Sequence, residues 1–427
     1  MTASTLGSIL RQGALALTLA GIAAASTAQT TPPPAYWSPS WMAPTQPLWD
    51  GSFVLPTGVP FQFNRQTVRQ VARLSIGGAK LRVVISNEGG TSPLRIGAAR
   101  MARHADGSAI VEGTDRVLRF GGQAEVTVPP GARLVSDPVD LPLPALSEVA
   151  MSLYLPQPSQ PAGFHFDARQ TACVADGDLT GAQRLPTAAT QWSTRVYVSG
   201  LIVETPTPPT TVVALGDSLT DGNGSTPGAN TRWPDALAER LAGRHVGVLN
   251  AGISGGRLMK DGMGRAALER AGRDVFAQPG VRAVVVLLGT NDIGWPGGPF
   301  APNEPAVRAE EMIQGFRQLI EMAHAHNVRI MGATIAPFER ALEGTPLEGH
   351  YSPDKDKVRQ AVNRWIRESG AFDAVVDFDA LLRDPARPVR MMAAMGSGDH
   401  LHPGDAGYKA MAAAIDLDAL LGVPVQP

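Results

Sequence analysis

The chain has 427 residues, of which 44% are hydrophobic and 18% are charged, so it is long enough for more than one domain with a packed core. Its formal net charge is −2, which argues against a nucleic-acid binder that relies on a strongly basic surface to neutralise phosphates. Cys173 is the single cysteine, so an intrachain disulfide is impossible, and a cysteine-rich scaffold or a Cys-based zinc finger is excluded.

Residues 1–28 have the features of a secretory signal peptide. Arg11 precedes an apolar run from Ala14 to Ala25, and the small residues that follow place a cleavage site before Gln29. The apolar run is too short for a helix that spans about 30 Å of hydrocarbon. We therefore expect an exported protein, secreted or periplasmic, that has no membrane partner after cleavage.

A strand-like pattern follows the Pro-rich lead-in at residues 29–36. Between residues 37 and 203, short apolar runs with partial alternation are interrupted by Gly and Pro, and no long amphipathic helix occurs. The clearest runs are Leu81–Ile85, Ala124–Val128, Val149–Leu155 and Arg195–Val203. This pattern predicts an all-β sandwich domain over residues 37–203. Carbohydrate binding, packing over the active site and assembly all stay open as its role.

The pattern changes after a second Pro-rich segment, residues 204–210, which predicts a stiff linker. From residue 211 to 427, continuous apolar runs alternate with helical patterns, as expected of strands that are buried on both faces. The predicted strands are Thr211–Leu215, Gly247–Asn250, Ala283–Leu288, Val328–Ile335 and Ala374–Val376. The predicted helices are Trp233–Ala242, Gly264–Gly272, Pro305–Ala325, Pro353–Glu368 and Asp405–Leu421. We expect a three-layer α/β/α domain with about five parallel strands, which binds its ligand beyond the carboxyl ends of those strands.

The first strand of this predicted sheet ends in Gly216-Asp-Ser218-Leu-Thr-Asp-Gly222. A serine directly after a buried strand can present its hydroxyl at the edge of the sheet, with its own N–H free at the start of a helix. The alternative is an ordinary N-cap serine, since serine is among the commonest residues there. The stretch is not the Gly-x-Ser-x-Gly turn of α/β-hydrolases.

Hydrogen-bond donors follow the next two predicted strands. The second strand leads into Ser254-Gly255-Gly256-Arg257, where paired glycines allow the backbone to approach a ligand closely or form a plain turn. The third strand leads into Asn291-Asp292, where the amide supplies two donors or closes an Asx-turn. Neither stretch has the spacing of a phosphate loop or a dinucleotide fingerprint.

A candidate base lies in Gly398-Asp-His-Leu-His-Pro403, before the last predicted helix. Asp399 and His402 are three residues apart, so one turn of a loop can bring the carboxylate to an imidazole nitrogen and orient the ring. His400 is the rival base, but it is adjacent to Asp399 and is expected to point elsewhere. Together the four motifs supply a nucleophile, a base, its orienting carboxylate and oxyanion donors, which acyl transfer needs.

A metal site built from these two histidines and the aspartate is an alternative, although no second cluster completes a ligand set. His324 and His326 lie in a helical pattern, where positions i and i+2 do not share a face. We expect them to be surface or packing residues. The chain is therefore expected to need no metal and no other cofactor.

In this order, the four motifs resemble those of the SGNH/GDSL hydrolase superfamily, and the resemblance covers about residues 211–421. It implies that Ser218 is the nucleophile, His402 the base and Asp399 the residue that orients it. It also implies an oxyanion hole formed by the N–H groups of Ser218 and Gly255 and the amide of Asn291. A shift of one residue would put Gly256 in place of Gly255.

Further stretches, Thr231–Asp235, Asn250–Ser254 and Gly398–Pro403, resemble an acylhydrolase/arylesterase branch linked to plant-polysaccharide breakdown, whose members have a β-rich domain before the hydrolase domain. The branch implies an exported serine esterase that acts on small-molecule or carbohydrate esters with small acyl groups, such as acetyl groups on sugars. Arylester and lipid substrates stay open.

Two aromatic residues, Trp295 and Phe300, follow the asparagine motif and are candidates for an apolar wall around the acyl group, with ordinary loop packing as the alternative. Two alternative functions stay open for the chain as a whole. One is a non-catalytic glycan-binding protein with a hydrolase-like domain, and the other is a metal-dependent hydrolase.

Overall fold

The computed structural model describes residues 35–51 and 53–422 of the chain. The predicted signal peptide at residues 1–28 and most of the lead-in at 29–36 lie outside the described residues. From Ala35 onward the chain clusters as one compact unit. The predicted linker at 204–210 lies inside this unit and overlaps two strands, one that ends at Thr205 and another that begins at Thr210.

Every regular element described between Tyr36 and Thr205 is a strand. The first large sheet has the order β1 (Tyr36–Met42), β16 (Val198–Thr205), β4 (Gly78–Ser86), β10 (Val139–Leu143), and β9 (Arg133–Val135) also pairs with β4. The second has the order β14 (Thr190–Trp192), β13 (Ala172–Asp176), β3 (Gln66–Arg73), β11 (Glu148–Leu155), β6 (Ala98–Arg103), β7 (Arg116–Val117). Two small sheets join β15 (Arg195–Val196), β12 (Gly163–His165) and β2 (Gln46–Pro47), and β5 (Leu94–Ile96) with β8 (Val126–Val128).

All these strands pair in an antiparallel manner, which confirms the predicted strand-rich half. Successive side chains of a strand point to opposite faces, so one face of each large sheet can be apolar. Leu81 and Val83 of β4 and Val149 and Met151 of β11 belong to one hydrophobic cluster between the two large sheets. A shared core of this kind is what a β-sandwich requires.

The second half contains a five-stranded sheet in which every pairing is parallel. Its order is β18 (Val246–Gly252), β17 (Thr210–Gly216), β19 (Val281–Leu287), β20 (Arg329–Ala333), β21 (Ala374–Val376). Within this sheet, β17 comes first in the sequence but lies between β18 and β19, which come second and third. The strand order therefore reverses at β17. Ligands of open α/β sheets bind beyond the carboxyl ends of the strands at such a point.

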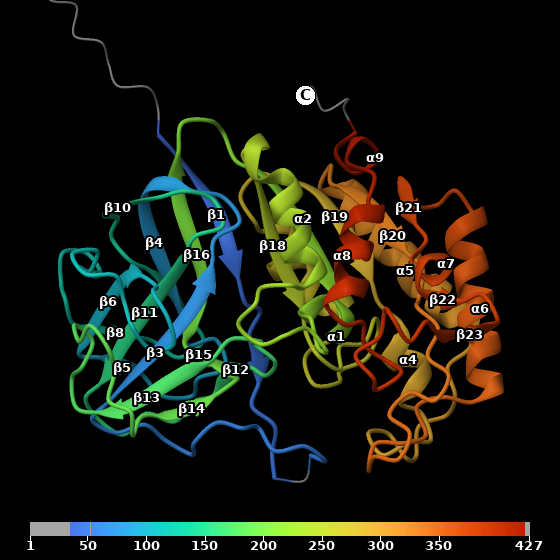
Figure 1. Cartoon of the computed structure of the whole chain (residues 1–427), viewed down its shortest axis with the longest axis horizontal. Coiled ribbons are helices and arrows are strands. Elements are labelled where there is room, and N and C mark those ends of the chain that lie inside the picture. Colours follow the sequence, from blue (N-terminus) through green and yellow to red (C-terminus); the bar gives the residue numbers. More distant parts are fainter. Residues whose placement is uncertain (1–34, 52, 423–427) are drawn as a thin grey trace, which may run out of the picture. The chain divides into compact units, whose positions relative to one another are not determined.

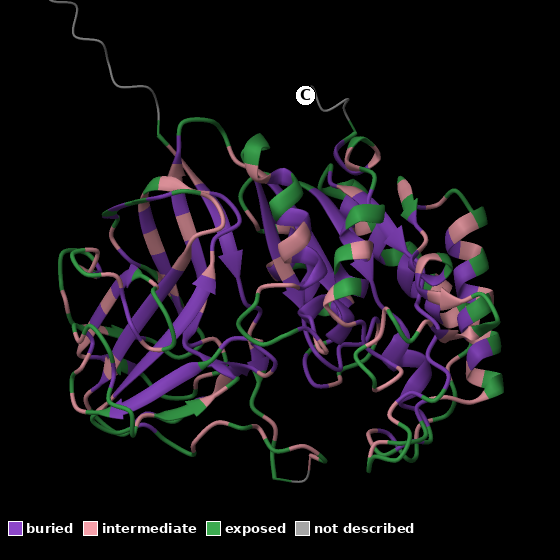
Figure 2. Cartoon of the chain, viewed as in Figure 1, coloured by how far each residue is buried: buried purple, intermediate pink, exposed green. Residues whose placement is uncertain are grey.

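Helices cover both faces of this sheet, as Figure 1 shows for α2 and α8 in front of the strands. One face packs against α2 (Trp233–Leu241), α7 (Phe378–Leu382), α8 (Asp405–Ala414) and α9 (Leu417–Leu421). The other packs against α3 (Ala267–Ala271), α5 (Ala309–Ala325) and α6 (Pro353–Glu368). The strands are buried and the outer faces of α2 and α6 are exposed (Figure 2). Within the described residues, no helix combines the length and the apolar character needed to cross a bilayer.

Short elements complete this half. They are α1 (Ser218–Asp221), α4 (Thr290–Gly294), the single turns η1 (Ala242–Arg244) and η2 (Gly272–Phe276), and a hairpin of β22 (Arg383–Asp384) and β23 (Arg387–Met391). The prediction of one helix over Asp405–Leu421 is wrong, because Asp416 accepts hydrogen bonds from the N–H groups of Asp418 and Ala419 and starts a new helix there. The helix predicted from Pro305 begins only at Ala309.

The antiparallel half covers the free edge of the parallel sheet at β18. An edge strand presents unpaired N–H and C=O groups. Here the N–H of Val248 donates to the hydroxyl of Ser75, with the two atoms 3.1 Å apart. The backbone of β1 also approaches closely, since a Cβ on Gly247 would lie 2.6 Å from the carbonyl oxygen of Pro39. The two halves therefore share a tightly packed boundary at this edge.

A buried arginine joins the carboxyl ends of two adjacent strands. Arg270 donates to the carbonyl oxygen of Gly216 at the end of β17 and to that of Ala251 near the end of β18, over 2.9 and 2.7 Å. Its charge is balanced by Asp274 at 3.1 Å, which also pairs with Arg273. These contacts fix the two strand ends from which the candidate site loops leave.

We expect Arg270→Leu to lower the free energy of unfolding by about 3 kcal/mol, because it leaves a buried carboxylate with one cation fewer and removes one donor from each of two carbonyl groups. Urea unfolding of the purified protein measures this change. Arg265→Ala is the matched control, since Arg265 is half exposed, pairs with Asp261 at the surface and should matter by less than about 1 kcal/mol. Equal losses in both variants would contradict the role given to Arg270.

Candidate active site

The sequence motifs meet at the carboxyl edge of the parallel sheet. Ser218 follows β17, Gly255 follows β18 and Asn291 follows β19, and these three strands are neighbours. His402 reaches the same edge from the loop before α8. The structure thus brings together the residues that the four motifs predicted.

Ser218 is the first residue of α1, directly after the strand. The preceding Asp217 is the N-cap, and its carboxylate accepts a hydrogen bond of 3.0 Å from the N–H of Leu219. Asp217 therefore takes the capping role, which leaves the hydroxyl of Ser218 for other partners. Gly216 allows this sharp turn, because a Cβ there would lie 2.0 Å from the hydroxyl oxygen of Thr220.

A continuous hydrogen-bonded chain connects Ser218, His402 and Asp399. The Oγ atom of Ser218 lies 2.8 Å from Nε2 of His402, and Nδ1 of the same ring lies 2.6 Å from Oδ2 of Asp399. The other carboxylate oxygen accepts hydrogen bonds from the N–H groups of His402 and Leu401, at 2.8 and 2.9 Å. This arrangement places the Nδ1 proton between the ring and the carboxylate and leaves Nε2 facing the hydroxyl.

Burial alone would raise the pKa of the Asp399 carboxyl, but the hydrogen bond and the charge interaction with His402, with help from two backbone N–H groups, hold it well below its usual range. Asp399 is therefore ionised at neutral pH. An ionised carboxylate at this position accepts the hydrogen bond from Nδ1 and fixes the orientation of the ring.

The two glycines in the turn after β18, Gly255 and Gly256, differ in how their N–H groups are used. The N–H of Gly256 donates to the carbonyl oxygen of Ile253 at 2.8 Å, so it is used within the turn. Gly255 lines the pocket beside Ser218 and has a φ of 68°, in the left-handed region that glycine tolerates. A Cβ on Gly255 would also lie 2.4 Å from the sulfur of Met263. The geometry therefore favours Gly255 over Gly256 as the backbone donor.

Asn291 lies in α4 and points its amide at the same turn. Its Nδ2 donates to the carbonyl oxygen of Gly256 at 3.0 Å. An amide nitrogen carries two hydrogens, so one is left for a ligand in the pocket. The contact also holds the turn that presents Gly255.

Two buried carboxyl groups next to these residues have raised pKa values. Burial raises the pKa of Asp217 to about 7, against the opposing effect of its hydrogen bond from Leu219. Burial likewise raises the pKa of Asp292 to about 6, although both of its oxygens accept from the N–H of Leu258, at 2.9 and 3.0 Å. Asp292 thereby ties α4 to the loop that carries Gly255. The sequence assigned no role to either residue.

These groups open into a pocket with a volume of about 170 Å³. Its polar lining includes Ser218, Asn223, Ser254, Gly255, Asn291, His350, Asp399 and His402. Its apolar lining consists of Leu55, Phe166, Met263, Trp295, Phe300, Leu342, Leu347 and Leu401. Trp295 and Phe300, the predicted wall, are stacked with ring centroids 4.5 Å apart. Sequence reasoning missed Leu55 and Phe166, which come from the antiparallel half.

His350 is a further pocket residue, and no sequence motif points to it. It is buried, and burial together with the nearby Lys355 lowers its pKa to about 3, so the ring is neutral at neutral pH. Its Nε2 has no hydrogen-bond partner among the described residues. Gly294 packs directly against this ring, since a Cβ there would lie 2.1 Å from Nε2.

The other histidines of the motifs lie elsewhere. His400 has a φ of 60° and does not line the pocket, as its neighbour Asp399 led us to expect. His324 lies 3.2 Å from Asp373 at the surface, and His326 stacks on Phe276, so both are surface or packing residues. Among the described residues, no group of three or more His, Cys, Asp or Glu side chains is placed to hold a metal ion.

Several known proteins are similar to this chain, each over about half of its length. The GDSL-like lipase from Bacteroides thetaiotaomicron is 20% identical with a TM-score of 0.37, and the match covers 49% of this chain and 87% of that one. The carbohydrate acetylesterase family member from Sinorhizobium meliloti is 16% identical with a TM-score of 0.38, over 50% of this chain and 100% of that one. An acetyl xylan esterase is 19% identical with a TM-score of 0.36, and the match covers 48% of this chain and 96% of that one.

At these identities and TM-scores, the structural similarities carry no argument about substrate. No curated protein matches the chain. Residues 214–410 match the sequence model of the GDSL-like lipase/acylhydrolase family, and this range contains Ser218, Gly255, Asn291, Asp399 and His402. Residues 214–410 are therefore similar to the GDSL-like lipase/acylhydrolase family, as their four motifs indicate.

Proposed function

We propose that the protein is a serine esterase that hydrolyses carboxylic esters through an acyl-serine intermediate. The observation that carries the proposal is the hydrogen-bonded chain from Ser218 through His402 to Asp399, at the mouth of a pocket with hydrogen-bond donors and an apolar wall. The match of residues 214–410 to the GDSL-like lipase/acylhydrolase family model supports the same reaction class. In this proposal Ser218, His402 and Asp399 form a catalytic triad.

In the first half of the reaction, the Oγ atom of Ser218 attacks the ester carbonyl carbon while Nε2 of His402 takes the hydroxyl proton. Asp399 stabilises the imidazolium that forms. The tetrahedral intermediate collapses, the bond to the alcohol oxygen breaks, and His402 returns its proton to the leaving alcohol. The acyl group is then bound to Ser218 as an ester.

In the second half, His402 takes a proton from water as the water oxygen attacks the acyl carbon. Collapse of the second intermediate releases the carboxylic acid and restores the proton to Ser218. In both intermediates the negative oxygen accepts hydrogen bonds from the N–H groups of Ser218 and Gly255 and from the amide of Asn291. Donors fixed before the reaction starts stabilise the developing charge most, because they need no reorganisation.

The substrates proposed are small-molecule or carbohydrate esters with small acyl groups, including acetyl groups on sugars. A volume of about 170 Å³ and a largely apolar wall suit a short acyl chain better than a long one. Export to the periplasm or outside the cell is part of the proposal and rests on the pattern of residues 1–28.

We expect Ser218→Ala to abolish nearly all hydrolysis of p-nitrophenyl acetate, because no other group in the pocket replaces the nucleophile. An organophosphonate should label Ser218 in the wild-type protein, which a non-catalytic glycan-binding protein would not permit. Ser352→Ala is the control, since the Ser352 hydroxyl caps α6 by accepting from the N–H of Lys355 and its loss should cost about 1 kcal/mol of stability without affecting turnover. Full activity of Ser218→Ala would refute the triad.

We expect Asn291→Ala to lower kcat by about 100- to 1000-fold, the usual effect of losing one oxyanion donor. Asn291→Asp keeps the size of the side chain but replaces the N–H donor by an oxygen, so it should lose at least as much. Steady-state kinetics with p-nitrophenyl acetate measure both. A loss of less than about tenfold in each variant would exclude the amide from the oxyanion hole.

We expect short acyl chains to be preferred, with acetyl and butyryl esters hydrolysed faster than octanoyl esters. Phe300→Ala removes part of the wall, and two additional buried methylene groups would then give about 1.6 kcal/mol, roughly a tenfold rise in the octanoyl-to-acetyl ratio of kcat/KM. Phe276→Ala, whose ring stacks on His326 outside the pocket, is the control. An unchanged ratio in Phe300→Ala would show that Phe300 does not limit chain length.

A further inference from the structure

A buried carboxylate connects the helix that begins at Ser218 to the residue before Gly255. Asp221 is the last residue of α1, and its Oδ2 accepts hydrogen bonds from both the N–H and the hydroxyl of Ser254, at 2.9 and 3.0 Å. Asp221 is 1% exposed. Ser254 precedes Gly255 directly, so this contact holds the residue whose carbonyl carbon is bonded to the proposed oxyanion donor, the N–H of Gly255.

The other oxygen of this carboxylate is held from the antiparallel half. Oδ1 of Asp221 lies 2.8 Å from Nε2 of His165, at the end of β12. The second ring nitrogen, Nδ1, lies 3.0 Å from the carbonyl oxygen of Pro44. Both partners are acceptors, so the ring satisfies both only when both of its nitrogens carry hydrogen. His165 is 6% exposed, so both of its hydrogen bonds are shielded from water.

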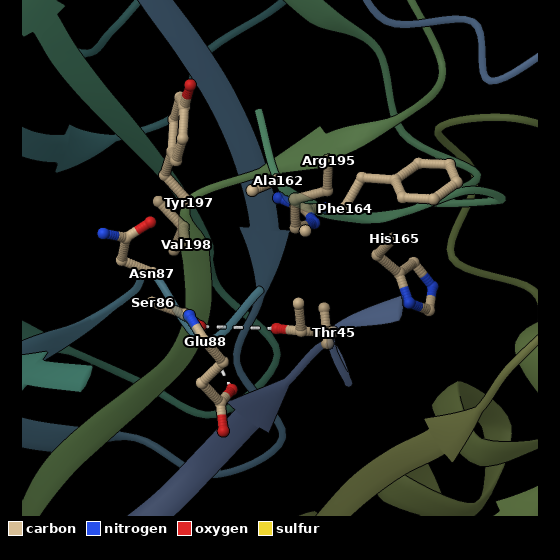
Figure 3. Close-up of a pocket in the computed structure, with 12 residues that line it drawn as sticks. Thr45, Ser86, Asn87, Glu88, Ala162, Phe164, His165, Arg195, Tyr197 and Val198 are labelled. Atoms are coloured by element: carbon tan, nitrogen blue, oxygen red, sulfur yellow. Dashed lines mark hydrogen bonds between the residues drawn. The ribbon is translucent and has the colours of Figure 1, made fainter. Parts of the chain in front are cut away.

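Figure 3 shows His165 at the margin of a small pocket in the antiparallel half, with its imidazole pointing away from Asn87 and Tyr197. That pocket has a volume of only about 10 Å³, which is room for about one water molecule. The nitrogens of His165 are both engaged elsewhere, with Asp221 and Pro44. The ring therefore belongs to the boundary with the parallel sheet rather than to this pocket.

The far end of the same loop is also held by the antiparallel half. The carbonyl oxygen of Met263 accepts from Nε2 of Gln46 at 2.9 Å and from Nε1 of Trp49 at 2.8 Å. The side chain of Met263 in turn occupies the space beside Gly255 where a Cβ would lie. The loop that carries Gly255 is thus held at one end by Asp221, which His165 contacts, and at the other end by Gln46 and Trp49.

We propose that His165 is a positioning residue for the oxyanion hole, acting through Asp221 and Ser254 on the N–H of Gly255. The inference rests on the proposed function, since it assigns to His165 a share in the transition-state stabilisation of that reaction. Gly255 has a positive φ and needs its neighbours to hold the peptide plane toward the substrate. A displacement of about 1 Å at such a donor costs about 100-fold in rate.

A second imidazole of the antiparallel half provides a matched control. Nδ1 of His104 lies 2.6 Å from Oε2 of Glu148, and its Nε2 lies 3.1 Å from the carbonyl oxygen of Gly107. The ring thus has one carboxylate and one backbone carbonyl as partners, as His165 has. It does not line the pocket, and its hydrogen-bond partners, Glu148 and Gly107, lie outside the Gly255 loop. Replacing His104 by alanine therefore shows how much activity is lost when an imidazole with two such hydrogen bonds is removed away from the oxyanion hole.

We expect His165→Ala to lower kcat for p-nitrophenyl acetate by about 10- to 100-fold with a much smaller change in KM, and His104→Ala to leave both close to wild type. Phenylboronic acid provides a second readout, because its serine adduct places an oxygen in the oxyanion hole. Its inhibition constant should rise by the same factor by which kcat/KM falls. Thermal unfolding followed by circular dichroism verifies that both variants are folded.

Variants of Asp221 test the same path from the other side. Asp221→Asn keeps an acceptor for Ser254 and can donate to a singly protonated His165, so it should retain kcat within a few-fold. Asp221→Ala breaks both contacts and should lose as much as His165→Ala. The double variant His165→Ala/Asp221→Ala should be no slower than Asp221→Ala alone, because residues that act through one path are not additive.

Three results would overturn the proposal: an unchanged kcat in His165→Ala, a loss confined to KM, or losses in His165→Ala and Asp221→Ala that multiply in the double variant. An equal loss in His104→Ala would show general destabilisation instead of positioning. These outcomes differ from failure of the proposed function, which full activity of Ser218→Ala would show. If His165→Ala does not fold, the contrast between Asp221→Asn and Asp221→Ala decides the question.

Discussion

The hydrogen bond between Ser218 and His402 joins two residues that are 184 positions apart, and the site exists only while this contact holds. A side chain at the start of α8 helps to hold the two segments together. Asp405, at the start of α8, accepts three hydrogen bonds from Thr226 and Thr231, at 2.6 to 2.8 Å. These contacts attach the loop after Ser218 to the end of the chain. The register between nucleophile and base is therefore set by polar contacts outside the pocket as well as by the sheet.

The same edge of the sheet concentrates buried carboxyl groups, which is costly away from water. Asp221 and Asp292 offset the cost of their burial by accepting hydrogen bonds from the backbone N–H groups of Ser254 and Leu258. The same hydrogen bonds hold the loop of the oxyanion hole in place. Asp217 is compensated less completely, since its Oδ2 has no partner among the described residues. Departures from ideal packing are expected where a site must hold polar groups in place before its ligand arrives.

The fold of the second half and most of the candidate site could be predicted because parallel strands bring their following loops to one edge. Ser218, Asn291 and His402 were found in this way. The choice between Gly255 and Gly256 needed the hydrogen bond inside the turn, which no spacing reveals. Asp416 looked like one more residue of a long helix, since a carboxylate at a cap and one on an exposed face have the same sequence pattern.

The contribution of the antiparallel half was beyond sequence reasoning for a different reason. His165 and Asp221 are 56 residues apart, and Gln46 and Met263 are 217 apart, with no motif around His165 or Gln46 to suggest a partner. A Pro-rich segment between two compositional regions predicts two separable domains, and that division is still a prediction. The contacts between the two halves favour a structural role of the first half at the site. Because Ser75 closes the edge of β18 and His165 reaches the carboxylate behind Ser254, the first half works as part of the scaffold of the site. Packing over the active site, one of the three roles left open for this half, is the one that these contacts support.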